Sequence, residues 1–424
     1  MKFASILLIE KNRFSLNEEQ PRELQGARAQ FEDSHVGLRI LSSVTEFEEF
    51  RTPWSGWTHC PEADLDYFSI HLKHAPGVVR PHVMVIYRGG RADCMLVGWL
   101  FHGTTVFKVG SYPLFRLNAR ILRFVNGGFL GNQSKENSRF LVGEILSSLQ
   151  RQEADAVEFS QLTTDSPLYE HAKREPNAFC RDHFTSVQNH PHLTLPPSFD
   201  TFLCRLSKKY RKEFRRNVKM FERDFPGKVQ FRTIFTGSDV EDFASKAGEI
   251  SQRTYQGALG VGFVNDLNAR EILHAAAQKA SLRAILLSIG KHPVAFNWAI
   301  LSNKTLYGIS TGYDPEFKKY RPGLQTMMRL IEQSFETNSE LLRIDAGCGD
   351  SPYKRALFDS TWPEAPVWIF APSLHGFRLH TAKLVSTLLH SLAMWLVTNS
   401  SLLRKVKKML HRRALRKFQR LNLR

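Results

Sequence analysis

The sequence predicts an α/β (α+β) protein built from two related halves and a basic helical tail. Three observations indicate this fold class. The chain has 424 residues, and one hydrophobic core is not expected at that length. Alternating apolar strands and amphipathic helices recur in the same order on both sides of a proline-rich segment at residues 187–198. The chain after Glu364 contains no acidic residue and twelve lysines and arginines.

The composition is that of a folded protein from a reducing compartment. Hydrophobic residues make up 42% of the chain, and its 31 phenylalanines are far more than a disordered chain would contain. The five cysteines are widely spaced and form no Cys-x-x-Cys pair, so they do not indicate a disulfide framework. Near the N-terminus, Glu10 and Lys11 follow the apolar run where a signal peptide would have small residues. We therefore expect a strand there and a cytoplasmic protein.

The first half, residues 1–195, is predicted to form a sheet with a covering helix. Apolar residues alternate in HVGLRILSS, and HVMVIY and CMLVGWLF flank the turn RGGRAD as in a β-hairpin. A helical pattern, SRFLVGEILSSLQRQ, precedes the short strand AVEFSQL. The predicted strands cover residues 35–43, 82–87, 94–101 and 156–162, and the helix covers 138–152.

The second half, residues 196–372, repeats this order in a longer form. The predicted strands cover residues 228–235, 284–289, 294–301, 306–313 and 341–347, and the predicted helices cover 200–225, 238–250, 267–280 and 323–336. The second helix is expected to begin with a capping box of Ser238 and Glu241. Hairpin, helix and strand recur in both halves at an offset of roughly 185 to 200 residues, which indicates a duplicated domain.

The helix expected at residues 200–225 has an apolar stripe and a basic face, and Pro226 and Gly227 end it. The basic face consists of Arg205, Lys208, Lys209, Arg211, Lys212, Arg215, Arg216, Lys219 and Arg223. A solvated helix face that covers a core is one interpretation. The other is a surface that attracts an anionic cofactor or partner.

The loop between the strand at 306–313 and the next helix has the features of a pyrophosphate site. A strand, a loop and the free amides of a helix N-terminus together favour phosphate binding. The loop residues are Tyr320, Arg321, Pro322, Gly323, Leu324 and Gln325. Pro322 fixes the approach of the chain, Gly323 lets backbone come close to phosphate, and Arg321 adds charge. A proline turn that begins a structural helix is the alternative.

Three segments of the second half resemble the GNAT acyl-CoA N-acyltransferase fold. They are LSKKYRKEFRRNVKMFE, TGYDPEFKKYRPGLQTMMRLIE and IDAGCGDSPYKRALF. The resemblance covers residues 200–370 and is closest to the CelD-like branch associated with cellulose or exopolysaccharide biosynthesis. The duplication, and Tyr353, Lys354 and Phe358 after the penultimate strand, are also similar to the Fem-type aminoacyltransferases that build peptidoglycan cross-bridges.

The resemblance implies two tandem GNAT-like domains, each a mixed, mostly antiparallel sheet flanked by helices, with the first copy degenerate. It implies acetyl-CoA or another acyl-CoA as cofactor, and an amine or hydroxyl of a cell-envelope or exopolysaccharide precursor as acceptor. The backbone of the strand at 306–313, at Ile309 and Thr311, is implied to pair with the pantetheine arm. The phosphate loop departs from the GNAT pattern, which has a second small residue after Gly-x, because this loop has one glycine.

In this chemistry the acceptor amine attacks the thioester directly, so a base must remove its proton and an acid must assist the departing thiolate. Asp345, Asp350, Tyr353 and Lys354 cluster at the carboxyl end of a predicted strand, where open α/β sheets bind ligands. We expect Asp350 to be the base or acceptor anchor and Tyr353 the acid. By analogy with Fem-type enzymes, Lys354 would bind an anion. A structural role, such as capping the next helix, is the alternative.

The acceptor is expected to contact aromatic and polar residues of the second half. Tyr255 and Phe263 flank the glycine-rich segment GALGVG, which we interpret as a mobile loop over the acceptor. Asn297 and Trp298, in the predicted hairpin, are the other candidates. A place in the hydrophobic core is the alternative for the aromatic residues.

Other readings of the motifs are weaker. LRIDAGCGDSP resembles the first motif of S-adenosylmethionine methyltransferases, but the short basic remainder of the chain cannot complete a doubly wound sheet. His71 and His74, and likewise His190 and His192, have no acidic or cysteine partner in sequence, so no metal is expected. A non-catalytic module that keeps the fold and docks on a membrane is the alternative from another functional class.

The tail, residues 373–424, is predicted to be a basic amphipathic helix. Residues 384–403 carry no charge but include too many polar side chains for a membrane span. The apolar face consists of Val385, Leu388, Leu389, Leu392, Trp395 and Leu396. The run RKVKKMLHRRALRKFQR follows, so residues 384–424 are expected to contact anionic lipid at the inner face of a membrane. Nucleic acid, or a solvated disordered end, is the alternative.

Overall fold

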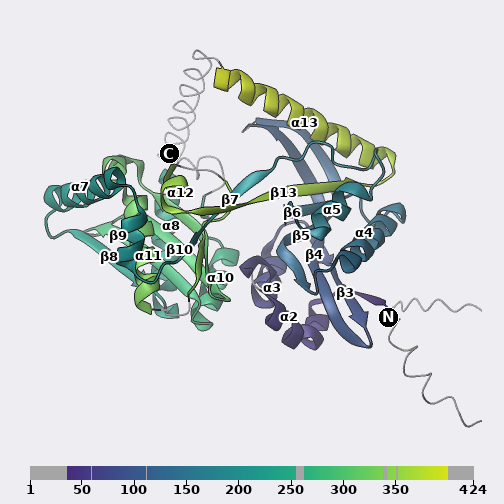
Figure 1. The fold of residues 1–424 in the computed structure, drawn as a ribbon, viewed down its shortest axis with the longest axis horizontal. Helices are drawn as coiled ribbons and strands as arrows, with labels where there is room; N and C mark the ends of the chain where they lie inside the picture. The colour runs from purple at the N-terminus through teal and green to yellow at the C-terminus, as the bar shows by residue number, and fades with distance from the viewer. Residues whose placement is uncertain are drawn as a thin grey trace, which may run out of the picture.

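The computed structural model describes residues 36–58, 60–110, 112–254, 262–337, 341–349 and 352–399. Two α/β halves lie side by side and share one sheet of 13 strands (Figure 1). The strand order is β1-β3-β4-β5-β6-β13-β7-β12-β11-β10-β9-β8, and β2 pairs with β4 outside this path. The expected fold class, with a mostly antiparallel mixed sheet flanked by helices in each half, is therefore confirmed. The strand expected near Glu10 lies outside the described residues.

The first half contains two long central strands that form its hairpin. Its strands are β1 (Gly37–Leu41), β2 (Val78–Pro81), β3 (Val83–Arg88), β4 (Arg91–Val109), β5 (Tyr112–Gly131) and β6 (Ala156–Thr163). Its helices are α2 (Arg51–Trp57), α3 (Leu65–His74), α4 (Lys135–Gln150) and α5 (Pro167–Arg174), with short 3₁₀ turns η2 (Val44–Phe50) and η3 (Pro61–Ala63). The apolar side of α4, with Leu141 and Ile145, packs on the sheet beside the stacked rings of Phe124 and Phe159.

The second half has the predicted order of elements. Its strands are β8 (Val229–Ile234), β9 (Leu282–Ile289), β10 (His292–Ser302), β11 (Thr305–Tyr313), β12 (Arg343–Asp345) and β13 (Ser360–Phe370), and β7 (Gln188–Thr194), which lies before residue 196, joins its sheet. Its helices are α6 (Phe199–Arg205), α7 (Lys208–Asp224), α8 (Val240–Arg253), α10 (Leu267–Gln278), α11 (Pro322–Thr337) and α12 (Pro352–Leu357), with 3₁₀ turns η4 (Gly237–Asp239) and η5 (Pro315–Tyr320).

The two halves exchange strands at their junction. β7 pairs antiparallel with β12 on one side and with β13 on the other. β13 in turn pairs antiparallel with β6 of the first half. The last strand of the second half therefore continues the sheet of the first half. The division at residues 195 and 196 remains a prediction, and the segments on both sides of it contribute to the junction.

Two local predictions were wrong. The helix expected at residues 200–225 is two helices, because Leu206 is extended (ψ 144°) and the hydroxyl of Ser207 accepts from the Tyr210 amide to start α7. The capping box of Ser238 and Glu241 is not formed, because a 3₁₀ turn precedes α8 and Asp239 is the N-cap without a side-chain bond. Glu241 forms salt bridges with α10 instead.

The C-terminal helix α13 (Leu374–Asn399) crosses the outer end of β4 and β5 (Figure 1). Its inner face buries Leu379 and Ala382 against aromatic residues of the first half. In the part of the chain that the structure describes, no helix combines the length and apolar character needed to span a bilayer. The basic run that follows α13 lies outside the described residues.

Candidate functional site

The strands β11 and β12 diverge at the junction of the two halves. They pair in parallel only from Thr305 with Arg343 to Tyr307 with Asp345, where β12 ends. β11 continues for six residues, and its ladder with β10 skips Ile309 between Gly308 and Ser310. A bulge of this kind re-aims backbone groups and is common beside functional sites. Among the described strands, none pairs with this part of β11 on its β12 side.

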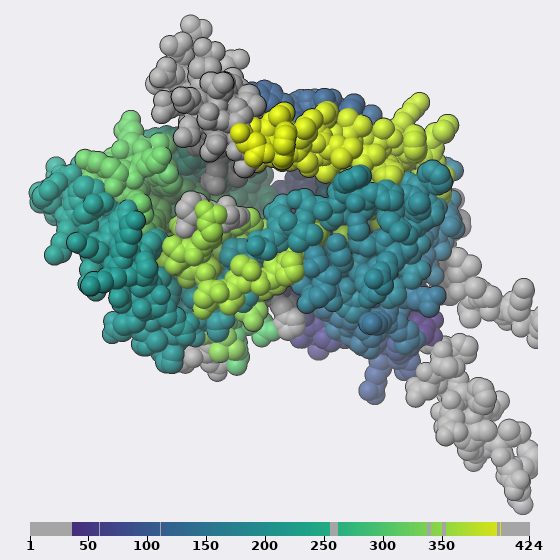
Figure 2. Space-filling model, turned by 45° about the horizontal axis from the view of Figure 1, so that its top comes forward, coloured from purple at the N-terminus to yellow at the C-terminus, as the bar shows by residue number. Residues whose placement is uncertain are grey.

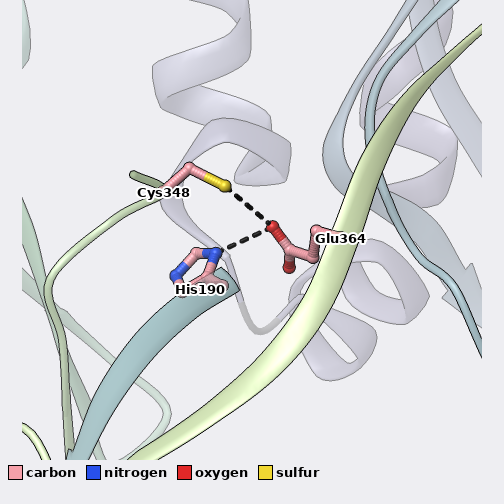
Figure 3. Close-up of side chains that lie close together, drawn as sticks. All are labelled: His190, Cys348 and Glu364. Carbon is pink, nitrogen blue, oxygen red and sulfur yellow. Dashed lines mark hydrogen bonds and ion pairs between the residues drawn. The ribbon is translucent and has the colours of Figure 1, made fainter. Parts of the chain in front are cut away.

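A buried histidine links three strands close to the point where β12 ends. The Nε2 atom of His190, on β7, lies 2.5 Å from Asp345 Oδ1 at the end of β12. Its Nδ1 atom lies 2.7 Å from Glu364 Oε2 on β13. The Sγ atom of Cys348 donates to the same Glu364 oxygen at 3.5 Å. Figure 3 shows the side chains of His190, Glu364 and Cys348 pointing toward one another from β7, β13 and the loop after β12. We call His190, Asp345, Cys348 and Glu364 the junction cluster.

The junction cluster is strongly polarised. Burial lowers the pKa of His190, but hydrogen bonds with Asp345, Cys348 and Glu364 outweigh it and raise the pKa to about 11. Burial raises the pKa of Glu364, but hydrogen bonds from His190 and Trp362 bring it below its usual value. The Trp362 ring also stacks on the His190 ring, with centroids 4.7 Å apart. His190 is therefore an imidazolium in this arrangement, and its ring is fixed on both edges and one face.

The loop after β12 is held from two sides. The Gly347 amide donates to Asp345 Oδ1 at 2.7 Å, and Gly347 has a φ of 71°, which favours glycine. The Nζ atom of Lys354, on α12, donates to the carbonyl oxygens of Gly347 and Cys348 at 2.9 and 3.1 Å. Asp345 and Lys354 thus belong to one structure that positions Cys348.

The first half contributes a third acid to the junction, beside Asp345 and Glu364. Glu62 lies on η3 and is an exposed residue. Desolvation by the surrounding protein nevertheless raises the pKa of its carboxyl group, and the negative charges of Asp345 and Glu364 raise this pKa further. Burial and the neighbouring Cys60 and Asp345 likewise raise the pKa of Tyr307 on β11, so its phenol stays protonated. Both groups are therefore close enough to the junction cluster for their charges to interact. Figure 2 shows the surface hollowed below α13, between the two halves.

Only some of the predicted catalytic residues lie at the junction of the two halves. Asp345 and Lys354 lie at the junction, as described above. Tyr353 is half-buried on α12 and packs against the hydrophobic core of the second half. Asp350 lies outside the described residues, as does Tyr255 of the predicted acceptor site. The roles assigned to these residues from the sequence remain predictions.

The predicted phosphate loop is anchored to α7. The buried ring of Tyr320 stacks on Phe221, and its hydroxyl donates to Asp224 Oδ2 at 2.8 Å. The guanidinium of Arg321 lies 2.6 Å from Glu213 Oε1, and Arg321 has a left-handed φ of 51°.

Some backbone amides at the start of α11 already donate hydrogen bonds within the protein. The amides of Leu324 and Gln325 both donate to the carbonyl oxygen of Arg321, and the Gln325 side chain donates to the Tyr320 carbonyl. Pro322 has no amide hydrogen. Gly323 lies against the Tyr313 ring, which a Cβ at this position would approach to 3.2 Å. Phosphate binding by this loop remains a prediction.

The predicted acceptor residues lie on or against β10. Asn297 is only 2% exposed, and its amide contacts Met327 Sδ. Trp298 is buried in the core beneath α8 and α10, where the half-buried ring of Phe263 packs at its edge. Nearby, the hydroxyl of Thr311 on β11 donates to the Phe296 carbonyl at 3.1 Å. Trp298 therefore lies in the hydrophobic core, which was the alternative to a place in the acceptor site. Contact of these residues with an acceptor remains a prediction.

Sequence reasoning missed His190, Cys348, Glu364 and Glu62. The expectation that His190 lacks an acidic or cysteine partner was wrong, because Asp345 and Glu364 reach it from 155 and 174 residues along the chain. One signal was available. The segment QNHPHLT is a strand, and its two histidines share one face of it.

The comparisons with known proteins concern the second half and the overall fold. Residues 208–355 match a family model described as an acetyltransferase (GNAT) domain. The structure resembles that of FemX, with 10% identity and a TM-score of 0.51 over 78% of this chain and 96% of that chain. It also resembles a conserved protein of unknown function from Bacteroides thetaiotaomicron VPI-5482, with 9% identity and a TM-score of 0.50 over 78% of this chain and all of that one. No curated protein matches the sequence. At such low identity the two structures show a shared fold.

Proposed function

We propose, from the premise that this chain carries a domain of the GNAT superfamily at residues 208–355, that it transfers an acyl group from acyl-CoA to an amine or hydroxyl acceptor at the junction of its halves. One observation carries the proposal. Beyond Tyr307, β11 passes the Ile309 bulge with no described strand on its β12 side, and Asp345 of the junction cluster ends β12 where the two strands diverge. In this proposal residues 196–372 hold the donor, and residues 1–195 help to form the acceptor side.

The donor would lie along β11. The unpaired backbone groups near Ile309 and Thr311 can bind the pantetheine arm and polarise the thioester carbonyl. The diphosphate would lie at the start of α11, where the Gly323 amide points out of the helix N-terminus. Arg321 is within reach of that position, although its charge is balanced by Glu213 in the free protein.

Glu62 is the proposed general base. Its raised pKa brings the carboxylate closer to the pKa of an efficient base at neutral pH, and its side chain is accessible. The acceptor nitrogen or oxygen attacks the thioester carbonyl, its proton passes to Glu62, and the carbon–sulfur bond breaks to release the thiolate of coenzyme A. Tyr307, whose phenol stays protonated, is the proposed hydrogen-bond donor that stabilises that thiolate, which takes its proton from solvent. Asp350 and Tyr353 remain the alternative base and acid.

The acyl group and the acceptor are proposed from the sequence resemblance alone. Acetyl is the expected acyl group, and an amino-sugar nucleotide or related cell-envelope precursor is the expected acceptor. The test is transfer by the full-length protein from acetyl-CoA and longer acyl-CoA thioesters to amino-sugar nucleotides, with coenzyme A release as the readout. A protein that binds no acyl-CoA would leave the non-catalytic module as the better account.

Fem-type aminoacyl transfer is the second candidate, and the basic face of α7 favours it. This face forms a shallow groove lined by Lys208, Arg211, Lys212, Arg215, Arg216, Lys219, Met220 and Arg223. A surface with this much positive charge is better matched to a large polyanionic donor than to a single diphosphate. Charged tRNA offered in competition with acetyl-CoA distinguishes the two donors.

We also propose that α13 and the basic tail hold the protein at an anionic membrane surface. The large apolar side chains that α13 exposes include Leu388, Leu389, Leu392, Trp395 and Leu396. The basic run of the sequence follows directly. An apolar helix face joined to a polybasic segment is the combination that binds anionic bilayers reversibly.

A further inference from the structure

We propose that His190, Cys348 and Glu364 form a binding site for a divalent transition metal, for which zinc is the best-fitting ion. One possible ligand atom from each residue lies within 4.8 Å of the other two. The residues come from β7, the loop after β12 and β13, so the ion would tie the exchanged strands together (Figure 3). The proposal rests on the geometry of these side chains and can be tested without measuring acyl transfer.

The donor set suits zinc. Imidazole nitrogen, thiolate sulfur and carboxylate oxygen are its usual protein ligands, and in a tetrahedral site two such atoms lie about 3.5 Å apart. The Sγ of Cys348 already lies 3.5 Å from Glu364 Oε2, and His190 Nδ1 lies 2.7 Å from that oxygen. The distance between His190 Nδ1 and Glu364 Oε2 must therefore lengthen by about 0.8 Å to admit the ion.

Each ligand is already oriented by a neighbouring group. Asp345 binds the far nitrogen of His190 at 2.5 Å, which is the usual arrangement of a carboxylate behind a zinc-bound histidine. The Trp362 indole donates to Oε1 of Glu364, so Oε2 is the oxygen that faces His190 and Cys348. Lys354 holds the carbonyl of Cys348. These contacts reduce the rearrangement that metal binding would require.

The charge balance is also favourable. In the metal-free arrangement a proton on His190 Nδ1 occupies the position between the imidazole and Glu364. Metal binding releases that proton and the Cys348 thiol proton to solvent, and the divalent charge is then balanced by the thiolate and the Glu364 carboxylate. Three protein ligands leave a fourth position for water or a substrate atom, as in catalytic zinc sites.

The test is Co²⁺ and Zn²⁺ binding to the full-length protein after chelator treatment and dialysis. We expect one ion per chain, and a Co²⁺ complex with a thiolate charge-transfer band that Zn²⁺ abolishes. Cys348→Ser should remove the band. Cys204→Ser is the matched control, because Cys204 is an exposed thiol on α6, and it should keep the band. Circular dichroism checks that each variant is folded.

A second variant separates a metal site from an ion-pair network. Asp345→Asn keeps a hydrogen-bond acceptor behind His190 but removes the charge, and should weaken Zn²⁺ binding by roughly 10- to 100-fold while one ion still binds at saturation. The proposal is overturned if the wild-type protein takes up no ion, if Cys348→Ser keeps the band, or if Asp345→Asn binds Zn²⁺ as tightly as the wild type. None of these results depends on acyl transfer.

Discussion

His190 Nε2 and Asp345 Oδ1 lie 2.5 Å apart although 155 residues separate them in the chain. The contact exists because β7 lies between β12 and β13, so that the strand exchange brings one histidine between the acidic residue that ends β12 and an acidic residue within β13. Proposed catalysis and proposed metal binding both depend on this arrangement, which no single segment of the chain forms.

Replacing Glu62 by Gln should reduce acyl transfer by about 10²- to 10⁴-fold, the usual contribution of a general base. Acyl-CoA affinity should change little, because the donor lies along β11. Steady-state kinetics together with calorimetry measure the two effects. Glu48→Gln is the matched control, since Glu48 is an exposed acid that pairs only with its neighbour Arg51 among its described contacts. Normal turnover by Glu62→Gln would remove this residue from the mechanism.

The rate of the same reaction should depend on pH as expected when a general base must be ionised. The pKa of Glu62 is raised above the ordinary glutamate value, and the carboxylate is active only when ionised. The rate should therefore rise with pH through a value above the usual glutamate range and then level off. This limb should be absent from the residual activity of Glu62→Gln. A limb that persists unchanged in the variant would assign it to another group.

Arg321→Ala should raise the KM for acyl-CoA several-fold with little change in kcat, because it removes a charge that binds the ground state and the transition state alike. Glu213→Gln is the informative partner variant. It frees Arg321 from its salt bridge and should leave the KM unchanged or lower it. An Arg321→Ala protein with wild-type KM would mean that the loop at the start of α11 does not bind the diphosphate.

Gly347→Ala should destabilise the protein by about 1 to 2 kcal/mol, because Gly347 has a φ of 71° that disfavours a Cβ. Gly143→Ala is the contrasting change. Gly143 lies in α4 with no atom near its Cβ position, so alanine should stabilise the helix by about 0.5 to 1 kcal/mol. Urea unfolding measures both. Equal stability of Gly347→Ala and the wild type would contradict the strained geometry of this loop.

Leu392→Glu combined with Trp395→Glu should abolish flotation of the protein with vesicles of anionic lipid, because these side chains are 52% and 61% exposed on α13. Phe231→Asp, on the distant edge strand β8, should leave flotation unchanged. Neutral vesicles should bind weakly, and added salt should release the protein. If the wild-type protein retards nucleic acid in a gel but does not float with vesicles, the tail binds nucleic acid and not anionic lipid.

Local pattern was enough to predict most of the elements, because each depends on residues close in sequence. The hairpin of β9 and β10 and the helix α11 follow directly from alternation and helical periodicity. The break at Ser207 was missed because apolar residues continue in helical register across it, while a serine cap starts a new helix. The junction cluster was missed for another reason. His190, Asp345 and Glu364 meet only through strand exchange, and sequence spacing carries no record of that pairing.

Calorimetric titration of the full-length protein with acetyl-CoA and with longer acyl-CoA thioesters tests the central claim most directly. The account predicts saturable binding of one acyl-CoA per chain, weakened in Arg321→Ala and retained in Glu62→Gln. Absence of binding by every acyl-CoA, under conditions in which the protein is folded, would contradict the claim that the gap beside β11 holds the donor.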